Sequence, residues 1–81
     1  MKAKETLNVV AYVYDCEHDG DIRAVKYECI DWFEKNNIDW KITSTYWDGH
    51  DCGEAYVIFS IPRTDEILSK VKESDLFQDW Y

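Results

Sequence analysis

The order of apolar patterns along the chain predicts an α+β fold. Residues 6–14, 39–47 and 54–61 alternate with the period of two that is typical of strands, whereas residues 22–33 repeat apolar positions every three or four residues, as a helix does. A second helical pattern follows residue 64. The order strand, helix, strand, strand, helix, with an optional short last strand, is typical of a ferredoxin-like split βαβ sandwich, an antiparallel sheet with two helices on one face. The length predicts a single domain over residues 1–81.

Residues 6–14 are expected to form a central strand, because both of its faces are largely apolar. One face carries Leu7, Val9, Ala11 and Val13, and the other carries Asn8, Val10, Tyr12 and Tyr14. Residues 15–21 then form a loop, in which Asp19 or Asp21 is expected to cap the following helix. That helix is expected to bury Ile22, Val25, Cys29 and Phe33, with Ile30 alongside. Asn36 and Asn37 end its pattern.

Residues 39–47 and 54–61 are expected to form a hairpin across the turn-forming segment 48–53. Strict alternation in the first strand places Trp40, Ile42, Ser44 and Tyr46 against Lys41, Thr43, Thr45 and Trp47. The core face of the second strand is expected to hold Ala55, Val57, Phe59 and Ile61.

Pro62 is expected to end the hairpin, and Thr64 or Asp65 to open a second helix. This helix continues through Ile67, Leu68 and Val71. Residues 75–81 fit either a short edge strand or an aromatic tail packed on the core.

The charge balance excludes several classes of partner. The chain carries 17 acidic and 9 basic side chains, a formal charge of −8. Phosphates and anionic membrane surfaces repel such a chain, so direct binding to nucleic acid or to a membrane is not expected. A hydrophobic content of 46% nevertheless supplies a folded core, unlike the composition of an acidic disordered tail.

The predicted topology brings two acidic segments together, because the first strand ends where the hairpin turns. Segments 15–21 and 48–54 contain no Lys or Arg and carry seven carboxylates: Asp15, Glu17, Asp19, Asp21, Asp48, Asp51 and Glu54. Close pairs of like charge cost a few tenths to about 1 kcal/mol each, so the cluster is not explained by stability and favours a cationic partner.

We therefore expect a non-enzymatic binding protein, monomeric or homodimeric, that blocks a basic nucleic-acid-binding site on another protein by charge mimicry. Tyr14, Tyr46 and Trp47 would add apolar contacts beside the carboxylates. The chain is similar in size and charge to acidic inhibitors encoded by phages and to the immunity proteins of bacterial nucleases. The alternative is a solvated acidic surface that only keeps the protein soluble.

No cofactor is expected, but the same segments suggest zinc as an alternative. Cys16 with His18 and His50 with Cys52 form two near-mirror pairs, each separated by one residue, and two thiolates with two imidazoles would suit tetrahedral zinc. This spacing is tighter than that of most structural zinc pairs. The opposing interpretation is that the histidines are exposed loop residues and the cysteines border the core.

One family resemblance covers residues 7–61. A strand ending in Asp15, a loop containing Gly20, the apolar helix positions and the Asn37-Ile38 entry to the next strand resemble the ACT-type regulatory domain. The resemblance implies a βαββαβ fold and an amino acid bound at the loop after the first strand. This loop lacks the family's usual proline and is far more acidic than the family's loop. The chain therefore differs from the family at the position where the family binds its ligand.

The cysteines favour neither a disulfide framework nor Cys-His catalysis. Three cysteines are too few and odd in number for a disulfide framework, so an intracellular protein with reduced thiols is expected. Surrounding carboxylates favour the protonated thiol over the thiolate, which opposes Cys-His catalysis, and the chain has no glycine-rich phosphate loop.

Overall fold

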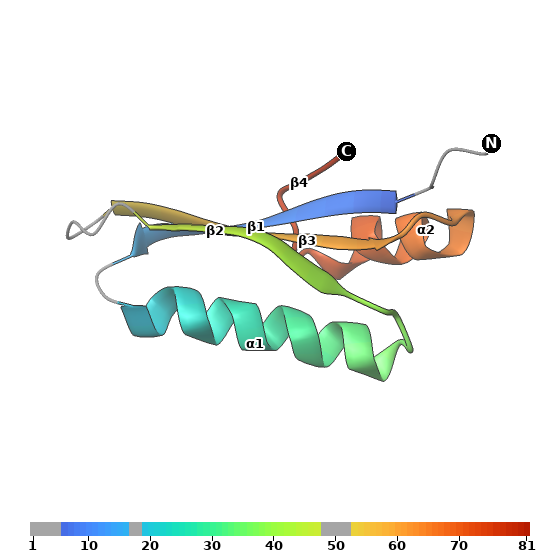
Figure 1. The fold of residues 1–81 in the computed structure, drawn as a ribbon, viewed down its shortest axis with the longest axis horizontal. Coiled ribbons are helices and arrows are strands. Elements are labelled where there is room, and N and C mark those ends of the chain that lie inside the picture. The colour runs from blue at the N-terminus through green and yellow to red at the C-terminus, as the bar shows by residue number, and fades with distance from the viewer. Residues whose placement is uncertain (1–5, 17–18, 48–52) are drawn as a thin grey trace.

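The computed structural model describes residues 6–16, 19–47 and 53–81. Within these residues the chain forms four strands and two helices in the predicted order (Figure 1). The elements are β1 (Thr6–Cys16), α1 (Asp19–Lys35), β2 (Lys41–Trp47), β3 (Gly53–Pro62), α2 (Asp65–Ser74) and β4 (Asp79–Trp80). The predicted α+β class is therefore confirmed.

All strand pairs in the sheet are antiparallel, and the strand order is β2-β3-β1-β4. β1 pairs with β3 on one side and with β4 on the other, so the prediction of a central first strand is confirmed. The short β4 joins β1 through Val9 and Val10. The strand alternative for the C-terminal segment therefore holds at residues 79–80.

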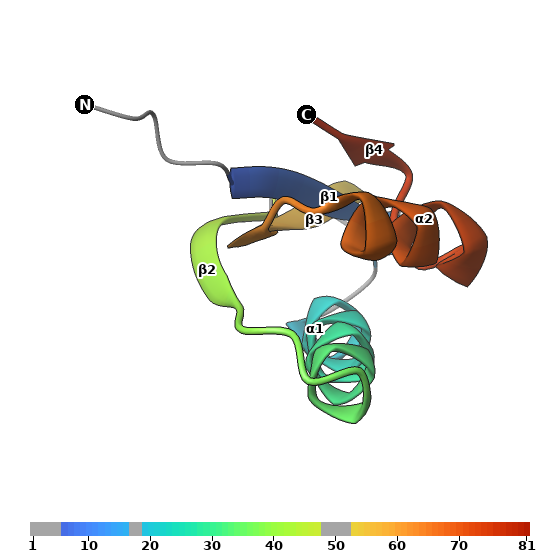
Figure 2. The same ribbon diagram turned by 90° about the vertical axis from the view of Figure 1, so that its right-hand side faces the viewer.

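Both helices lie on the same side of the sheet (Figure 2). The side of the sheet that faces them supplies alternate residues of β1 and β3 to the core, as their period of two predicts. The buried core consists of Leu7, Val9, Ala11, Ile22, Cys29, Phe33, Ile38, Ala55, Val57, Phe59, Ile61, Val71 and Phe77. The opposite side of the sheet, which we call the open face, has no helix packed on it among the described residues.

The C-terminus of α1 is a Schellman turn, and this explains why the apolar pattern stops at the two asparagines. The backbone N–H of Ile38 donates to the carbonyl of Phe33 at 2.8 Å, and that of Asn37 donates to Glu34 at 3.3 Å. Asn37 has φ 55°, a left-handed conformation that asparagine tolerates better than most residues. Ile38 and Phe33 are both buried and provide the apolar contact that accompanies this turn.

α2 begins at a capped N-terminus. Of the two predicted cap residues, Thr64 is the cap, since its hydroxyl oxygen accepts a 3.1 Å hydrogen bond from the backbone N–H of Ile67. Asp75, at φ 61°, ends the helix in a left-handed conformation. The chain then turns back so that Phe77 enters the core and β4 reaches β1.

The strict alternation predicted for residues 39–47 is wrong, because β2 contains a bulge. Ile42 pairs with Phe59 and Ser44 with Ile58, so Thr43 is an extra residue, and its hydroxyl donates to the Ile58 carbonyl at 3.2 Å. Beyond the bulge the two faces exchange. Ile42 therefore points toward the core while Tyr46 lies on the open face.

The aromatic C-terminal segment both packs on the core and joins the sheet. Phe77 is buried, Trp80 is half-buried against the core, and Tyr81 is exposed. Across the described residues, the structure contains no helix with the length and apolar character that a membrane crossing requires.

Candidate functional site

Three chain segments that lead into the acidic loops meet at one end of the sheet. Cys16 at the end of β1 pairs with Gly53 at the start of β3, and Trp47 at the end of β2 pairs with Ala55. The first turn of α1 lies at the same end (Figure 1). The described residues that flank 17–18 and 48–52 are therefore neighbours, as the predicted topology requires. We call this region, with segments 15–21 and 48–54, the acidic end.

The predicted site residues differ in how far the structure describes them. Outside the described residues lie Glu17, His18, Asp48, His50, Asp51 and Cys52. For five others the backbone is placed: Tyr14, Asp15 and Cys16 end β1, and Asp19 and Asp21 lie in the first turn of α1. The predicted loop 15–21 is therefore too long, and the prediction that Asp19 or Asp21 caps the helix from outside is wrong, because the helix already begins at Asp19. The carboxylate cluster and the zinc ligand set both depend on these residues, so both remain predictions. Among the described residues, no group of three His, Cys, Asp or Glu side chains is placed to hold a metal ion.

Three predicted contact residues have described side chains, and they lie on different faces. Tyr46 is exposed on the open face, and Glu54 is exposed two positions before Tyr56 on the same face of β3. Trp47 lies on the helix side, half-buried against the core. Its indole N–H is buried without a hydrogen-bond partner among the described residues. Tyr46 and Glu54 are thus the described members that a partner on the open face can reach.

Beside the acidic end, three tyrosines line up across the open face, and we call them the tyrosine row: Tyr12 of β1, Tyr56 of β3 and Tyr46 of β2. The strand register pairs Tyr12 with Tyr56 and Tyr56 with Tyr46. The Tyr12 and Tyr56 rings meet edge to face with centroids 5.8 Å apart, and the Tyr56 and Tyr46 rings stack at 5.3 Å and 23°. Tyr46 remains 46% exposed although it is stacked.

Sequence reasoning missed Tyr12 and Tyr56 as site residues. Alternation does place both of them on the sheet face that points away from the core. Tyr12 follows buried Ala11, and Tyr56 lies between buried Ala55 and Val57. The signal that was overlooked is register, because a hairpin turning near residue 51 pairs Tyr46 with Tyr56.

The open face changes character with distance from the acidic end. Next to the tyrosine row lies a row formed by Val10, Ile58 and Ser44, and beyond it a polar row formed by Asn8, Ser60 and Lys41. Val10 is buried although it lies on the open face, and Ile58 is half-buried. On the far side of β1, Asp79 pairs with Val10 and so projects to this same face.

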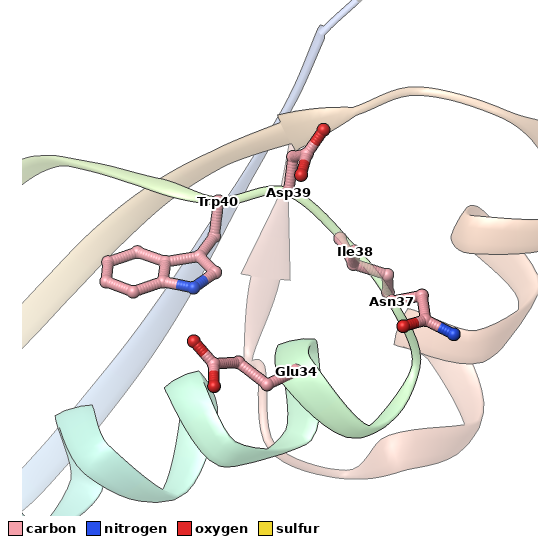
Figure 3. Close-up of a pocket in the computed structure, with 5 residues that line it drawn as sticks. All are labelled: Glu34, Asn37, Ile38, Asp39 and Trp40. Carbon is pink, nitrogen blue, oxygen red and sulfur yellow. The ribbon is translucent and has the colours of Figure 1, made fainter.

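A hollow on the helix side of the sheet has few groups that could bind a ligand. It is lined by Glu34, Asn37, Ile38, Asp39 and Trp40, where the Schellman turn leads into β2 (Figure 3). The Glu34 carboxylate points toward the Trp40 indole, whereas the Asp39 carboxylate points away from it (Figure 3). One carboxylate beside one indole does not surround a ligand.

Cys29 is the cysteine whose side chain the structure describes, and it is unsuited to nucleophilic chemistry. It is fully buried on the core face of α1, as its apolar spacing predicts. Burial, and after it the neighbouring Glu28 carboxylate, raises the pKa of the Cys29 thiol to about 12. The thiol therefore stays protonated at neutral pH and packs as a small apolar side chain.

Comparison with protein-family models, with curated proteins and with solved structures gives no match to this chain.

Proposed function

We propose that this protein is a non-enzymatic, acidic binding module that occludes a basic nucleic-acid-binding site on another protein. The observation that carries the proposal is the meeting of β1, β2 and β3 at one end of the sheet. At that end the chain enters and leaves segments with seven carboxylates and neither Lys nor Arg. The carboxylates of such a surface repel one another and repel phosphates, but they attract a groove lined by Lys and Arg.

In charge mimicry, the carboxylates of this protein would take the place of nucleic-acid phosphates. A nucleic-acid-handling protein neutralises a row of phosphates with cations, and closely spaced carboxylates offer those cations an alternative counter-charge. Complementary potentials accelerate encounter and orient the two proteins, while aromatic contacts slow dissociation. Tyr46 is an exposed aromatic residue beside the acidic end that is suited to this second task.

We also propose that the fold is of the ferredoxin-like split βαβ type. The strand order β2-β3-β1-β4 supports this, as do antiparallel pairing throughout and two helices on one side. The protein would act inside the cell with reduced cysteines and without a cofactor. The zinc alternative and the amino-acid site implied by the ACT-type resemblance remain predictions.

Charge reversal at the acidic end tests the proposed function. We expect that replacing Asp19, Asp21, Asp48 and Asp51 together with Lys abolishes capture of basic nucleic-acid-handling proteins from a cell lysate. The measurement is a pull-down at low and high salt, in which the wild-type capture should weaken as salt rises, because screening reduces the attraction.

A matched variant distinguishes the effect of charge at the acidic end from the effect of the net charge of the whole chain. Replacing Glu28, Glu34, Asp39 and Glu73 with Lys changes the net charge equally, and all four side chains are exposed away from the acidic end. We expect this variant to retain most of the capture. Equal capture by the acidic-end variant and the wild type would show that the proposed function is wrong.

A further inference from the structure

We propose that the tyrosine row is a docking platform for arginine side chains of the basic partner. The contact surface would then extend from the acidic end onto the open face of the sheet. This inference rests on the proposed function and deepens it, since it assigns the chemistry by which the partner is anchored. The inference is supported by the alignment of Tyr12, Tyr56 and Tyr46 on the open face of the sheet.

The ring geometry suits a planar cation. Tyr46 and Tyr56 are nearly parallel, at 23°, so the face of Tyr46 that is turned away from Tyr56 has no aromatic neighbour among the described residues. A guanidinium group is flat and weakly hydrated, and it stacks on such a face. The contacts between the rings also hold them in place before binding, which lowers the entropic cost of ordering them.

The charges around the tyrosine row favour arginine over other stacking partners. Glu54 lies on the same face of β3, two positions before Tyr56, and Asp79 projects to this face from β4. Lys41 lies in the polar row, two rows away from the tyrosines. A guanidinium over the tyrosines can therefore combine ring stacking with attraction to these carboxylates.

The same charges disfavour the other occupants of an aromatic sheet face. Nucleic-acid bases also stack on tyrosine, but their phosphates would meet an acidic chain of charge −8. A second copy of the chain would bring the same excess of negative charge. Charge complementarity thus selects a basic protein segment as the occupant.

The test compares two peptides of equal charge, nona-arginine and nona-lysine, by fluorescence anisotropy at physiological salt. We expect the full chain to bind nona-arginine about three- to tenfold more tightly, because only the guanidinium stacks well on tyrosine. Y46L should reduce this preference, since leucine keeps apolar bulk but has no π face, whereas Y46F should retain it. Y56L should act like Y46L, with its amide NMR spectrum verifying the fold.

The matched control is Y27L, which removes another exposed tyrosine, on α1 and away from the open face. It should leave the preference for arginine unchanged. Equal binding of the two peptides, or a preference that persists in both Y46L and Y56L, would overturn the inference. Binding of an oligo-dT strand as tight as that of nona-arginine would overturn it in favour of nucleic acid. Failure of the proposed function is a different result, namely unchanged affinity for both peptides after charge reversal at the acidic end.

Discussion

Phe33 is the side chain on which three distant parts of the chain meet. Its ring lies 4.9 Å from that of Phe59 in β3 and 5.7 Å from that of Phe77, which follows α2. Trp32, next to it on α1, makes an edge contact with Phe77 at 5.5 Å. Helical spacing was enough to predict Phe33 as a core residue, but its stacking partner depends on how the C-terminal segment folds back.

Cys29 gives a prediction about pH at the residue scale. In the unfolded chain its thiol releases a proton near pH 9.0, whereas in the folded chain the pKa is raised to about 12. Between these values the unfolded state binds fewer protons, so the free energy of unfolding should fall as pH rises, by up to about 1.4 kcal/mol per pH unit from this group. Urea denaturation at a series of pH values measures this slope.

Cys29→Ala is the matching variant for that experiment. It should be less stable than the wild type at pH 7, where the thiol is protonated in both states, but its stability should fall less steeply above pH 9. Identical slopes for the two proteins would contradict the raised pKa.

At the scale of single elements, local chemistry sets the ends of the helices. The Schellman turn at Asn37 and the threonine cap at Thr64 both follow from residues recognisable in the sequence. The α2 helix has ten residues and only Val71 fully buried, so its cap is a substantial part of its stability.

Thr64→Ala should therefore lower the free energy of unfolding by about 1 kcal/mol, because the backbone N–H of Ile67 loses its acceptor. Thr64→Ser should retain most of the stability, since a serine hydroxyl accepts the same hydrogen bond. Chemical denaturation of the three proteins checks this. Equal losses in the two variants would show that the methyl group of Thr64, rather than its hydroxyl, stabilises the helix.

The β2 strand shows where reasoning from a single element fails. Its sequence alternates evenly through Thr43, yet the bulge there exchanges the faces and moves Tyr46 away from Ile42. A bulge depends on which residues of β3 lie opposite, and this cannot be seen in the β2 sequence alone. The tyrosine row was missed for the same reason, because it exists only once three strands are in register.

At the scale of the whole molecule, stability depends on closure of the core by the last residues of the chain. Phe77 is buried against Phe33 and Trp32, and β4 holds this segment to β1. A domain of this size has a total stability of only about 4–12 kcal/mol. A large buried ring is therefore a considerable share of the total.

Phe77→Ala should cost about 3–5 kcal/mol and lower the melting temperature by at least about 12 °C. The control is Tyr81→Ala, because the Tyr81 side chain is 61% exposed and its hydrogen bonds to Asn8 use the backbone. We expect that control to melt close to the wild type. Thermal unfolding followed by circular dichroism measures both, and a small effect of Phe77→Ala would show that the core closes without this ring.

The candidate site was predictable in part. The order of the elements and the antiparallel hairpin imply that segments 15–21 and 48–54 leave one end of the sheet, and the pairing of Cys16 with Gly53 agrees with this. Which faces the aromatic residues of β2 occupy was not predictable, because of the bulge in that strand. Tyr46 and Trp47 are adjacent in sequence and both aromatic, but one lies on the open face and the other packs on the core.

The sequence by itself determined the α+β class, the order of the elements, the end of α1, the start of α2 and the acidic segments between the elements. These features depend on local periodicity, capping and charge, which are properties of residues near one another in the chain. Only the tertiary structure decided the bulge in β2, the entry of Phe77 into the core and the alignment of Tyr12, Tyr56 and Tyr46. Each of these depends on register or packing between distant segments, where a shift of one residue moves a side chain to the other face.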